Sequence, residues 1–144
     1  MDSVNKEQVN HPSHYNQGKI EVITVIDDWH LDFSLGNVVK YLARAGHKSD
    51  NISEDLSKAL WYLNHHINLI SNNIDNAILH TDIMYDQKLI FADWNIKPDS
   101  ITEKILDRIY NAIISKNAFI YGVLMLDAKE VLKNYIVELS KKGA

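Results

Sequence analysis

Chemically versatile side chains gather in three short segments in the first half of this sequence. The segments are HPSHYNQG at residues 11–18, GNVVKYLARAGHK at residues 36–48 and EDLSKALWYL at residues 54–63. Imidazole, ammonium, guanidinium, phenol and amide groups recur there at a density that a hydrophobic core does not need. Cations and donors hold phosphate oxygens, and aromatic rings stack on bases. These segments therefore predict a binding site for a phosphorylated, planar ligand.

In the second segment, four polar side chains are spaced so that they share one face of a helix. Positions i, i+3, i+4 and i+7 are held by Asn37, Lys40, Tyr41 and Arg44, and Lys48 follows shortly after. On one interpretation, the cations hold phosphate oxygens while Tyr41 flanks a base. On the other, the stripe is an ordinary solvated helix face, and spacing alone does not decide between the two.

The third segment adds a cation and a phenol at helical spacing from an acid. Asp55, Lys58 and Tyr62 lie at i, i+3 and i+7. One interpretation is an intrahelical Asp55–Lys58 pair, which contributes only ~0.3–0.5 kcal/mol. The other is that Lys58 faces the same ligand as Lys40 and Arg44, with Tyr62 beside it.

The first segment carries His11, His14 and Tyr15. The two imidazoles could ligate a metal together with Glu21 or with the histidines at 65–66. The chain has no cysteine, and no HExxH or HxxxH pattern completes the set, so we expect no metal site. We expect instead a ligand-facing loop, in which imidazoles donate to phosphate and Tyr15 stacks on a base. The alternative is capping and packing of an N-terminal arm.

Composition limits the class of protein. With 144 residues, 46% of them hydrophobic, the chain is expected to form a single domain over residues 1–144. The absence of cysteine excludes disulfides and thiol nucleophiles and is typical of a reducing cytoplasm. The polar start and the lack of any apolar run near ~20 residues indicate neither a signal peptide nor a membrane span. The net charge of −4 makes a nucleic-acid partner an unfavoured alternative.

Hydrophobic periodicity predicts a mainly α fold of four to six helices. Helices are expected in five places, which are residues 20–29, residues 35–45, a long stretch capped by Asn51 or Ser53, a stretch after the Ser100–Glu103 capping box, and a last helix opening at residues 127–130. Residues 81–94 are rich in β-branched and aromatic side chains and predict a short β-hairpin. Residues 118–126 fit either a strand or a buried helix.

The aromatic residues of the two halves are expected to differ in role. Large indole rings usually fill a core, and this is expected of Trp29, Trp61 and Trp94. Interfaces favour aromatic side chains, and the second half is rich in them, with Tyr110, Phe119, Tyr121 and Tyr135. The sequence therefore predicts a homo-oligomer.

Taken in order, the three segments resemble a bacteriophage family of small proteins, mostly labelled uncharacterised or phage nucleotide kinase. The shared pattern is HPxHYxxGxxE, then GNxxKYxxRxGxK, then EDLxKAxxYL, and it covers roughly residues 9–66. The resemblance implies a family-like, nucleotide-binding helical core over residues 9–70. Residues 75–144 resemble no family and are expected to form a helical extension that supports oligomerisation and completes the pocket.

The resemblance implies a phage origin and a place in the cytosol of the host bacterium. By similarity to the phage deoxynucleoside monophosphate kinase that lacks a phosphate loop, it also implies nucleotide binding. We expect non-catalytic capture of a linear or cyclic nucleotide immune signal of the host, which needs one tight site and no cofactor. The alternative is a nucleotide kinase, which would need two nucleotide sites and Mg²⁺ held by carboxylates. The sequence has no GxxxxGK[ST] motif, and no acidic pair stands out as a magnesium clamp.

Overall fold

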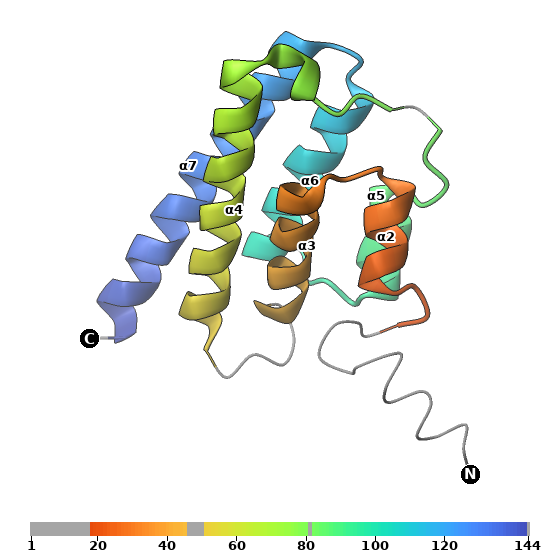
Figure 1. Ribbon diagram of the computed structural model, residues 1–144. Helices are drawn as coiled ribbons and strands as arrows, with labels where there is room; N and C mark the ends of the chain where they lie inside the picture. The colour runs from red at the N-terminus through yellow and green to blue at the C-terminus, as the bar shows by residue number, and fades with distance from the viewer. Residues whose placement is uncertain (1–17, 46–50, 81, 144) are drawn as a thin grey trace.

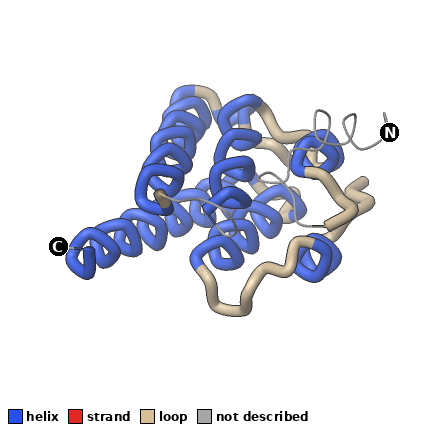
Figure 2. Tube along the Cα trace, turned by 90° about the horizontal axis from the view of Figure 1, so that it is seen from below, coloured by secondary structure: helices blue, strands red, loops and turns tan. Residues whose placement is uncertain are grey.

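The computed structural model describes residues 18–45, 51–80 and 82–143, and this part of the chain is built from helices (Figure 1). The elements are α2 (Val22–Asp28), α3 (Phe33–Ala45), α4 (Ile52–Asn72), the 3₁₀ turn η1 (Ile74–Asn76), α5 (Gln87–Asp93), α6 (Ile101–Ile114) and α7 (Ala118–Gly143). The predicted mainly α fold is confirmed. Figure 2 shows helices and loops but no strand in the described chain.

The helices pack around one core, in which α2 contacts α3 and α5 contacts α6. α4 and α7 lie side by side along one flank, α3 and α6 lie at the centre, and α2 and α5 form the other flank (Figure 1). Fully buried aliphatic side chains from both halves of the chain meet between them, among them Leu42, Leu63 and Leu106. The segment with family-like motifs therefore shares its core with the second half.

Two predicted helix caps are confirmed by their hydrogen bonds. The Asn51 side-chain oxygen accepts from the Glu54 amide at 3.0 Å. Of the two candidates, Asn51 and not Ser53 is therefore the N-cap of α4. The Ser100 hydroxyl accepts from the Glu103 amide at 3.2 Å, and the Glu103 carboxylate accepts from the Asp99 amide at 2.8 Å. These bonds satisfy amide groups that a helix start would otherwise leave unpaired.

The β-hairpin expected at residues 81–94 is wrong. The structure forms α5 there, and the Asp86 carboxylate caps it by accepting from the Leu89 amide at 2.9 Å. Residues 86–87, in the middle of the expected hairpin, are the start of this helix. Ile90 and Trp94, four residues apart, lie on one side of this short helix and are buried. These apolar residues therefore fill the core and do not form strands.

The second correction concerns the last helix, which was expected to open at residues 127–130. α7 is one continuous helix of 26 residues from Ala118, so the strand alternative for residues 118–126 is also wrong. The Asn117 side-chain oxygen accepts from the Ile120 amide at 2.9 Å in the first turn. Asp127 does not cap a helix; its carboxylate accepts from the Arg108 guanidinium at 2.6 Å. No described helix combines the length and apolarity that a membrane crossing would need.

The chain just before α2 is fastened to the end of α5. The Asp93 carboxylate accepts from the amides of Lys19 at 3.2 Å and Ile20 at 2.8 Å, and the Trp94 indole donates to the Ile20 carbonyl at 2.6 Å. A β-carbon on Gly18 would overlap the carbonyl oxygen of Asp93. Gly18, part of the first motif, is therefore required here for close packing.

Candidate functional site

The polar stripe predicted on α3 exists. Asn37, Lys40, Tyr41 and Arg44 are all half-buried along one side of the helix. Val38 and the other apolar residues between them are fully buried on the opposite side. A helix with one buried apolar side and a polar outer side is what the 3.6-residue period produces.

Residues from α3 and α4 meet around a pair of stacked rings. The rings of Tyr41 and Tyr62 are 6.2 Å apart and nearly parallel, at 12°. The ammonium groups of Lys40 and Lys58 lie 5.1 Å and 5.5 Å from the centre of the Tyr41 ring. Lys58 therefore shares a surface with Lys40. We call the surface formed by Lys40, Tyr41, Arg44, Lys58, Trp61 and Tyr62 the cation–aromatic face.

The acid that pairs with Lys58 is not the one expected. The Lys58 ammonium lies 3.0 Å from the carboxylate of Glu54, one turn earlier on α4. The hydrogen bond to Glu54 raises the pKa of Lys58, and the negative charge of Glu54 acts in the same direction. The Asp55–Lys58 pair considered from spacing is thus replaced by Glu54–Lys58, and the ammonium keeps its charge at neutral pH.

Arg44 has a structural partner as well as a place on this surface. Its Nε lies 3.5 Å from a carboxylate oxygen of Asp55. Asp55 is only 3% exposed, whereas the Arg44 side chain is 33% exposed. The other Asp55 oxygen is buried without a hydrogen-bond partner in the described chain. A buried carboxylate needs a nearby cation, so Arg44 also has a structural role beside Asp55.

One of the three tryptophans lies on this face. Trp29 and Trp94 are buried as expected, but Trp61 is 62% exposed, so its predicted core position is wrong. Its ring stacks on His65 at 5.6 Å and 4°, and it meets Tyr62 edge-on at 5.0 Å. The sequence contained a signal for this exposure. Trp61 is three residues after Lys58 and four before His65, so it shares their polar side of α4 and not the buried apolar side.

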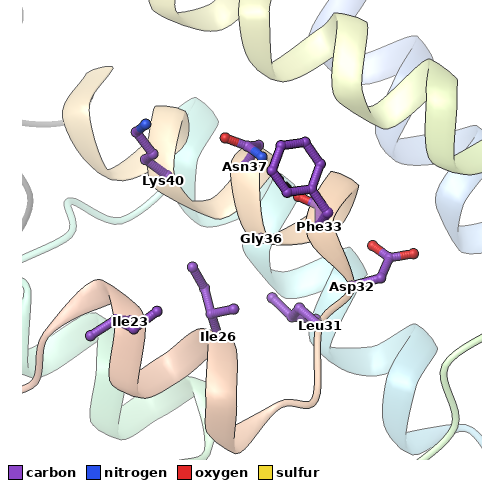
Figure 3. Close-up of a pocket in the computed structure, with 8 residues that line it drawn as sticks. All are labelled: Ile23, Ile26, Leu31, Asp32, Phe33, Gly36, Asn37 and Lys40. Carbon is purple, nitrogen blue, oxygen red and sulfur yellow. Dashed lines mark hydrogen bonds between the residues drawn. The ribbon is translucent and has the colours of Figure 1, made fainter.

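A shallow groove of about 230 Å³ borders this face between α2 and α3 (Figure 3). Its lining residues are Ile23, Ile26, Leu31, Asp32, Phe33, Gly36, Asn37 and Lys40. Figure 3 places Lys40 at one end of the groove and Asp32 at the other. Asn37 donates from its amide to the Phe33 carbonyl at 2.9 Å. A β-carbon on Gly36 would lie 3.3 Å from Ile26, so glycine lets the two helices approach.

A chain of hydrogen bonds joins Asp32, directly before α3, to α4 and α7. The His66 ring lies 3.0 Å from the Asp32 carboxylate through Nδ1 and 2.6 Å from the Tyr121 hydroxyl through Nε2. Burial raises the pKa of Tyr121, so its phenol stays protonated. Burial also acts to raise the pKa of Asp32, but hydrogen bonds from His66 and the Leu35 amide outweigh it and lower that pKa.

His66 and Tyr121 are both fully buried, so their hydrogen bond holds α4 and α7 together and is closed to a ligand. Asp32, at the other end, is part-exposed and lines the groove. Tyr121, expected at an interface between subunits, belongs to the core. Tyr110 also packs against the core, with its ring 5.2 Å from that of Trp29. From the sequence, His66 was weighed as a metal ligand and Tyr121 was expected at an interface. Their hydrogen bond could not be predicted, because the two residues lie 55 positions apart in the chain.

The structure therefore brings together five of the predicted ligand-binding residues. They are Lys40, Tyr41, Arg44, Lys58 and Tyr62. Asn37 lies beside them and lines the groove. The other four candidates, His11, His14, Tyr15 and Lys48, lie outside the described residues.

Side chains able to hold a metal ion form one group in the described chain, and it is not on this face. It consists of His30, His80 and Asp82. The carboxylates that do border the face, Glu54 and Asp55, already lie against Lys58 and Arg44. The face thus offers cations and aromatic rings, which suit an anionic ligand.

Comparison with known protein families finds a match to part of the chain. Residues 9–64, under half of the 144, match the sequence profile of a family described as "protein of unknown function (DUF3310)". No curated protein and no solved structure matches the chain. The matched segment includes α2, α3 and the first part of α4, and so contains all six residues of the cation–aromatic face.

Proposed function

We propose that the cation–aromatic face binds a phosphorylated nucleotide. The observation that supports this is the position of two ammonium groups, from Lys40 and Lys58, beside the stacked rings of Tyr41 and Tyr62. Arg44, one helical turn from Lys40, adds a guanidinium that can hold two phosphate oxygens at once. The exposed Trp61 supplies a flat apolar surface for a base.

We further propose that the protein retains the nucleotide without chemical turnover. Phosphoryl transfer usually requires carboxylates that hold magnesium next to the phosphates. The two acids beside these cations, Glu54 and Asp55, lie 3.0 Å and 3.5 Å from cations of the face itself. Retention alone would suit a phage-encoded protein that captures a nucleotide immune signal of its host, and it needs no cofactor.

The alternative is a nucleotide kinase without a phosphate loop, and one observation favours it. The groove between α2 and α3 shares Lys40 with the cation–aromatic face. A kinase holds two nucleotides whose phosphates meet, and Lys40 would lie between two such sites. The groove, at about 230 Å³, is below the ~300 Å³ that small-molecule pockets usually reach. Retention without turnover is therefore the better supported function.

The test is to incubate the purified protein with defined nucleotides and then identify what it releases on heating. The set contains deoxynucleoside monophosphates with and without ATP and Mg²⁺, linear oligonucleotides and cyclic dinucleotides. We expect one ligand to bind and to be recovered unchanged by mass spectrometry. Recovery of a deoxynucleoside diphosphate would overturn retention and support the kinase. Failure of every nucleotide to bind would overturn the site itself.

A matched variant makes this test specific to the face. Arg108, the only other arginine, lies on α6 and pairs with Asp127 of α7. Arg44→Ala is expected to abolish most of the captured nucleotide, whereas Arg108→Ala should capture as much as the parent. Equal losses in both variants would mean that binding depends on overall charge, and would contradict the proposed face.

We also propose that the protein is a homo-oligomer, joined through the outer side of α7. Four large apolar side chains are exposed there, namely Phe119, Ile120, Val123 and Leu126. We call them the α7 apolar face. The first nine residues of α7 carry no charge. Exposed apolar patches of this kind mark sites of protein contact, and a second copy would present the same helix to it.

A further inference from the structure

Three side chains outside the cation–aromatic face place their ligand atoms close together. They are His30, two residues past the end of α2, and His80 and Asp82, which precede α5 in the chain. Nε2 of His30 and Nδ1 of His80 each lie 3.7 Å from the same oxygen of Asp82. The two imidazole rings are stacked, with centres 4.1 Å apart and planes at 25°. All the ligand atoms lie within 4.8 Å of one another.

These separations suit an ion between the side chains better than direct hydrogen bonds. A nitrogen–oxygen hydrogen bond spans about 2.7–3.2 Å, and both nitrogens are farther than that from Asp82. Around a zinc-like ion, bonds of about 2.0–2.1 Å place the ligand atoms of a tetrahedron about 3.3 Å apart. Both nitrogen–oxygen separations exceed that spacing by only a few tenths of an ångström. Rotation of the two imidazoles out of their stacked arrangement would then bring the carboxylate and both rings onto one ion.

The backbone fixes His30 at this position. His30 has a φ of 55°, in the left-handed region that few residues other than glycine adopt. Its amide donates to the Asp27 carbonyl at 3.1 Å, and the Leu31 amide donates to the Ile26 carbonyl at 3.0 Å. These two bonds close the end of α2. His30 occupies a backbone position where glycine is usual. The left-handed backbone and the two hydrogen bonds therefore hold its side chain at the end of α2.

The loop that carries the other two ligands is held on both sides. Before them, the His80 amide donates to the Ile113 carbonyl of α6 at 3.0 Å. After them, the Asp28 carboxylate accepts from the amides of Met84 at 3.0 Å and Tyr85 at 2.9 Å. Asp28 belongs to α2, two residues before His30. The same helix end thus supplies one ligand and anchors the loop that supplies the others.

We propose that His30, His80 and Asp82 form a binding site for a divalent transition-metal ion of the zinc class. Two imidazoles and one carboxylate favour zinc, nickel, copper or iron over magnesium and calcium, which prefer all-oxygen ligands. The expectation of no metal site weighed the histidines at positions 11, 14, 65 and 66 but not His30 and His80. Sequence separation of 50 residues hides this group until the chain folds.

A bound ion would clamp the loop before α5 to the end of α2. One ligand lies inside the segment that matches the family, and two lie beyond it. Three protein ligands leave a further coordination position for water or another donor. The site is separate from the nucleotide proposal, and either can hold without the other.

The test is zinc binding to chelator-treated protein by calorimetry, with Mg²⁺ as the comparison ion. We expect one Zn²⁺ per chain and no measurable heat with Mg²⁺. Asp82→Asn and His80→Gln should each weaken Zn²⁺ binding at least tenfold. His30→Asn should do the same, since asparagine tolerates the left-handed backbone. The matched control is His65→Gln, an exposed histidine outside the group, which should bind like the parent.

A second readout separates this site from scattered surface histidines. Co²⁺ bound to two imidazoles and a carboxylate should give visible absorption bands in the parent and in His65→Gln, but not in Asp82→Asn. Asp82 is 75% exposed on its side chain, so its substitution should leave the circular dichroism spectrum unchanged. Zn²⁺ binding that is equal in the parent, Asp82→Asn and His80→Gln would overturn the proposal.

Discussion

The cation–aromatic face of α3 and α4 and the α7 apolar face both expose large side chains, but only the first adds positive charge. Two ammonium groups lie beside the Tyr41 ring, and the guanidinium of Arg44, three residues further along α3, lies against Asp55. Around Phe119, by contrast, residues 118–126 carry no charged group. Rings beside cations suit a small planar anion, whereas an apolar helix side suits another protein surface. The difference predicts that substitutions in the two places will affect different measurements.

The largest expected effect is that of Arg44→Ala on nucleotide affinity. Loss of the bidentate phosphate contact should cost roughly 2–4 kcal/mol. Arg44→Lys should recover part of this, and Lys40→Ala should cost less. Calorimetry with the captured nucleotide measures each value. Parent-like affinity in Arg44→Ala would show that the phosphate clamp is wrong.

Arg44→Ala also has a structural consequence, because it leaves Asp55 buried without its cation. We expect the free energy of unfolding to fall by about 1–3 kcal/mol. Adding Asp55→Asn should restore much of the stability but none of the affinity. Urea unfolding followed by circular dichroism gives the stability, and calorimetry on the same double variant gives the affinity. Recovery of both together would mean that Arg44 acts only through Asp55.

Trp61→Ala tests whether the exposed ring on α4 contacts a base. Base–aromatic stacking contributes about 1–3 kcal/mol, so affinity should fall by that amount while stability stays near that of the parent. Phe119→Ala is the matched control, since Phe119 is 77% exposed but lies on α7. Fluorescence titration with nucleotide should separate the two variants. A comparable loss of nucleotide affinity in Phe119→Ala would mean that the two faces do not differ in nucleotide binding.

Tyr121→Phe tests the buried junction between the two regions. It removes the hydroxyl 2.6 Å from Nε2 of His66 and leaves that buried nitrogen without its partner. The free energy of unfolding should fall by about 1–3 kcal/mol, as measured by urea unfolding. Nucleotide affinity should be unchanged, since neither residue reaches the surface. A loss of nucleotide affinity without a loss of stability would mean that the His66–Tyr121 hydrogen bond belongs to the binding site.

The smallest expected effect concerns self-association. The double substitution Phe119→Ser and Leu126→Ser should weaken it tenfold, about 1.4 kcal/mol, and shift the mass in light scattering toward the monomer. Trp61→Ala should leave the mass of the parent unchanged. A monomeric parent at micromolar concentration would contradict the oligomer, and a mass shift in Trp61→Ala would place the contact on the other face.

Local rules in the sequence were sufficient for much of the fold. The helical period and the caps at Asn51 and Ser100 predicted α3, α4 and α6, because caps and amphipathic stripes act within a few residues. The hairpin at residues 81–94 failed because short apolar runs fit a strand or a buried helix equally well. The prediction that α7 begins at Asp127 was wrong because the sequence does not distinguish an aspartate that caps a helix from one that pairs with an arginine, here Arg108.

The sequence by itself determined the polar stripe of α3, since residues three and four apart on one helix share a side. Only the tertiary structure decided that Lys58 meets Tyr41, that Trp61 is exposed and that Arg44 faces a buried Asp55. It alone also joined His30 to His80 and His66 to Tyr121. Such pairs depend on how helices pack, and packing is set by the burial of many side chains at once, which no short spacing along the chain encodes.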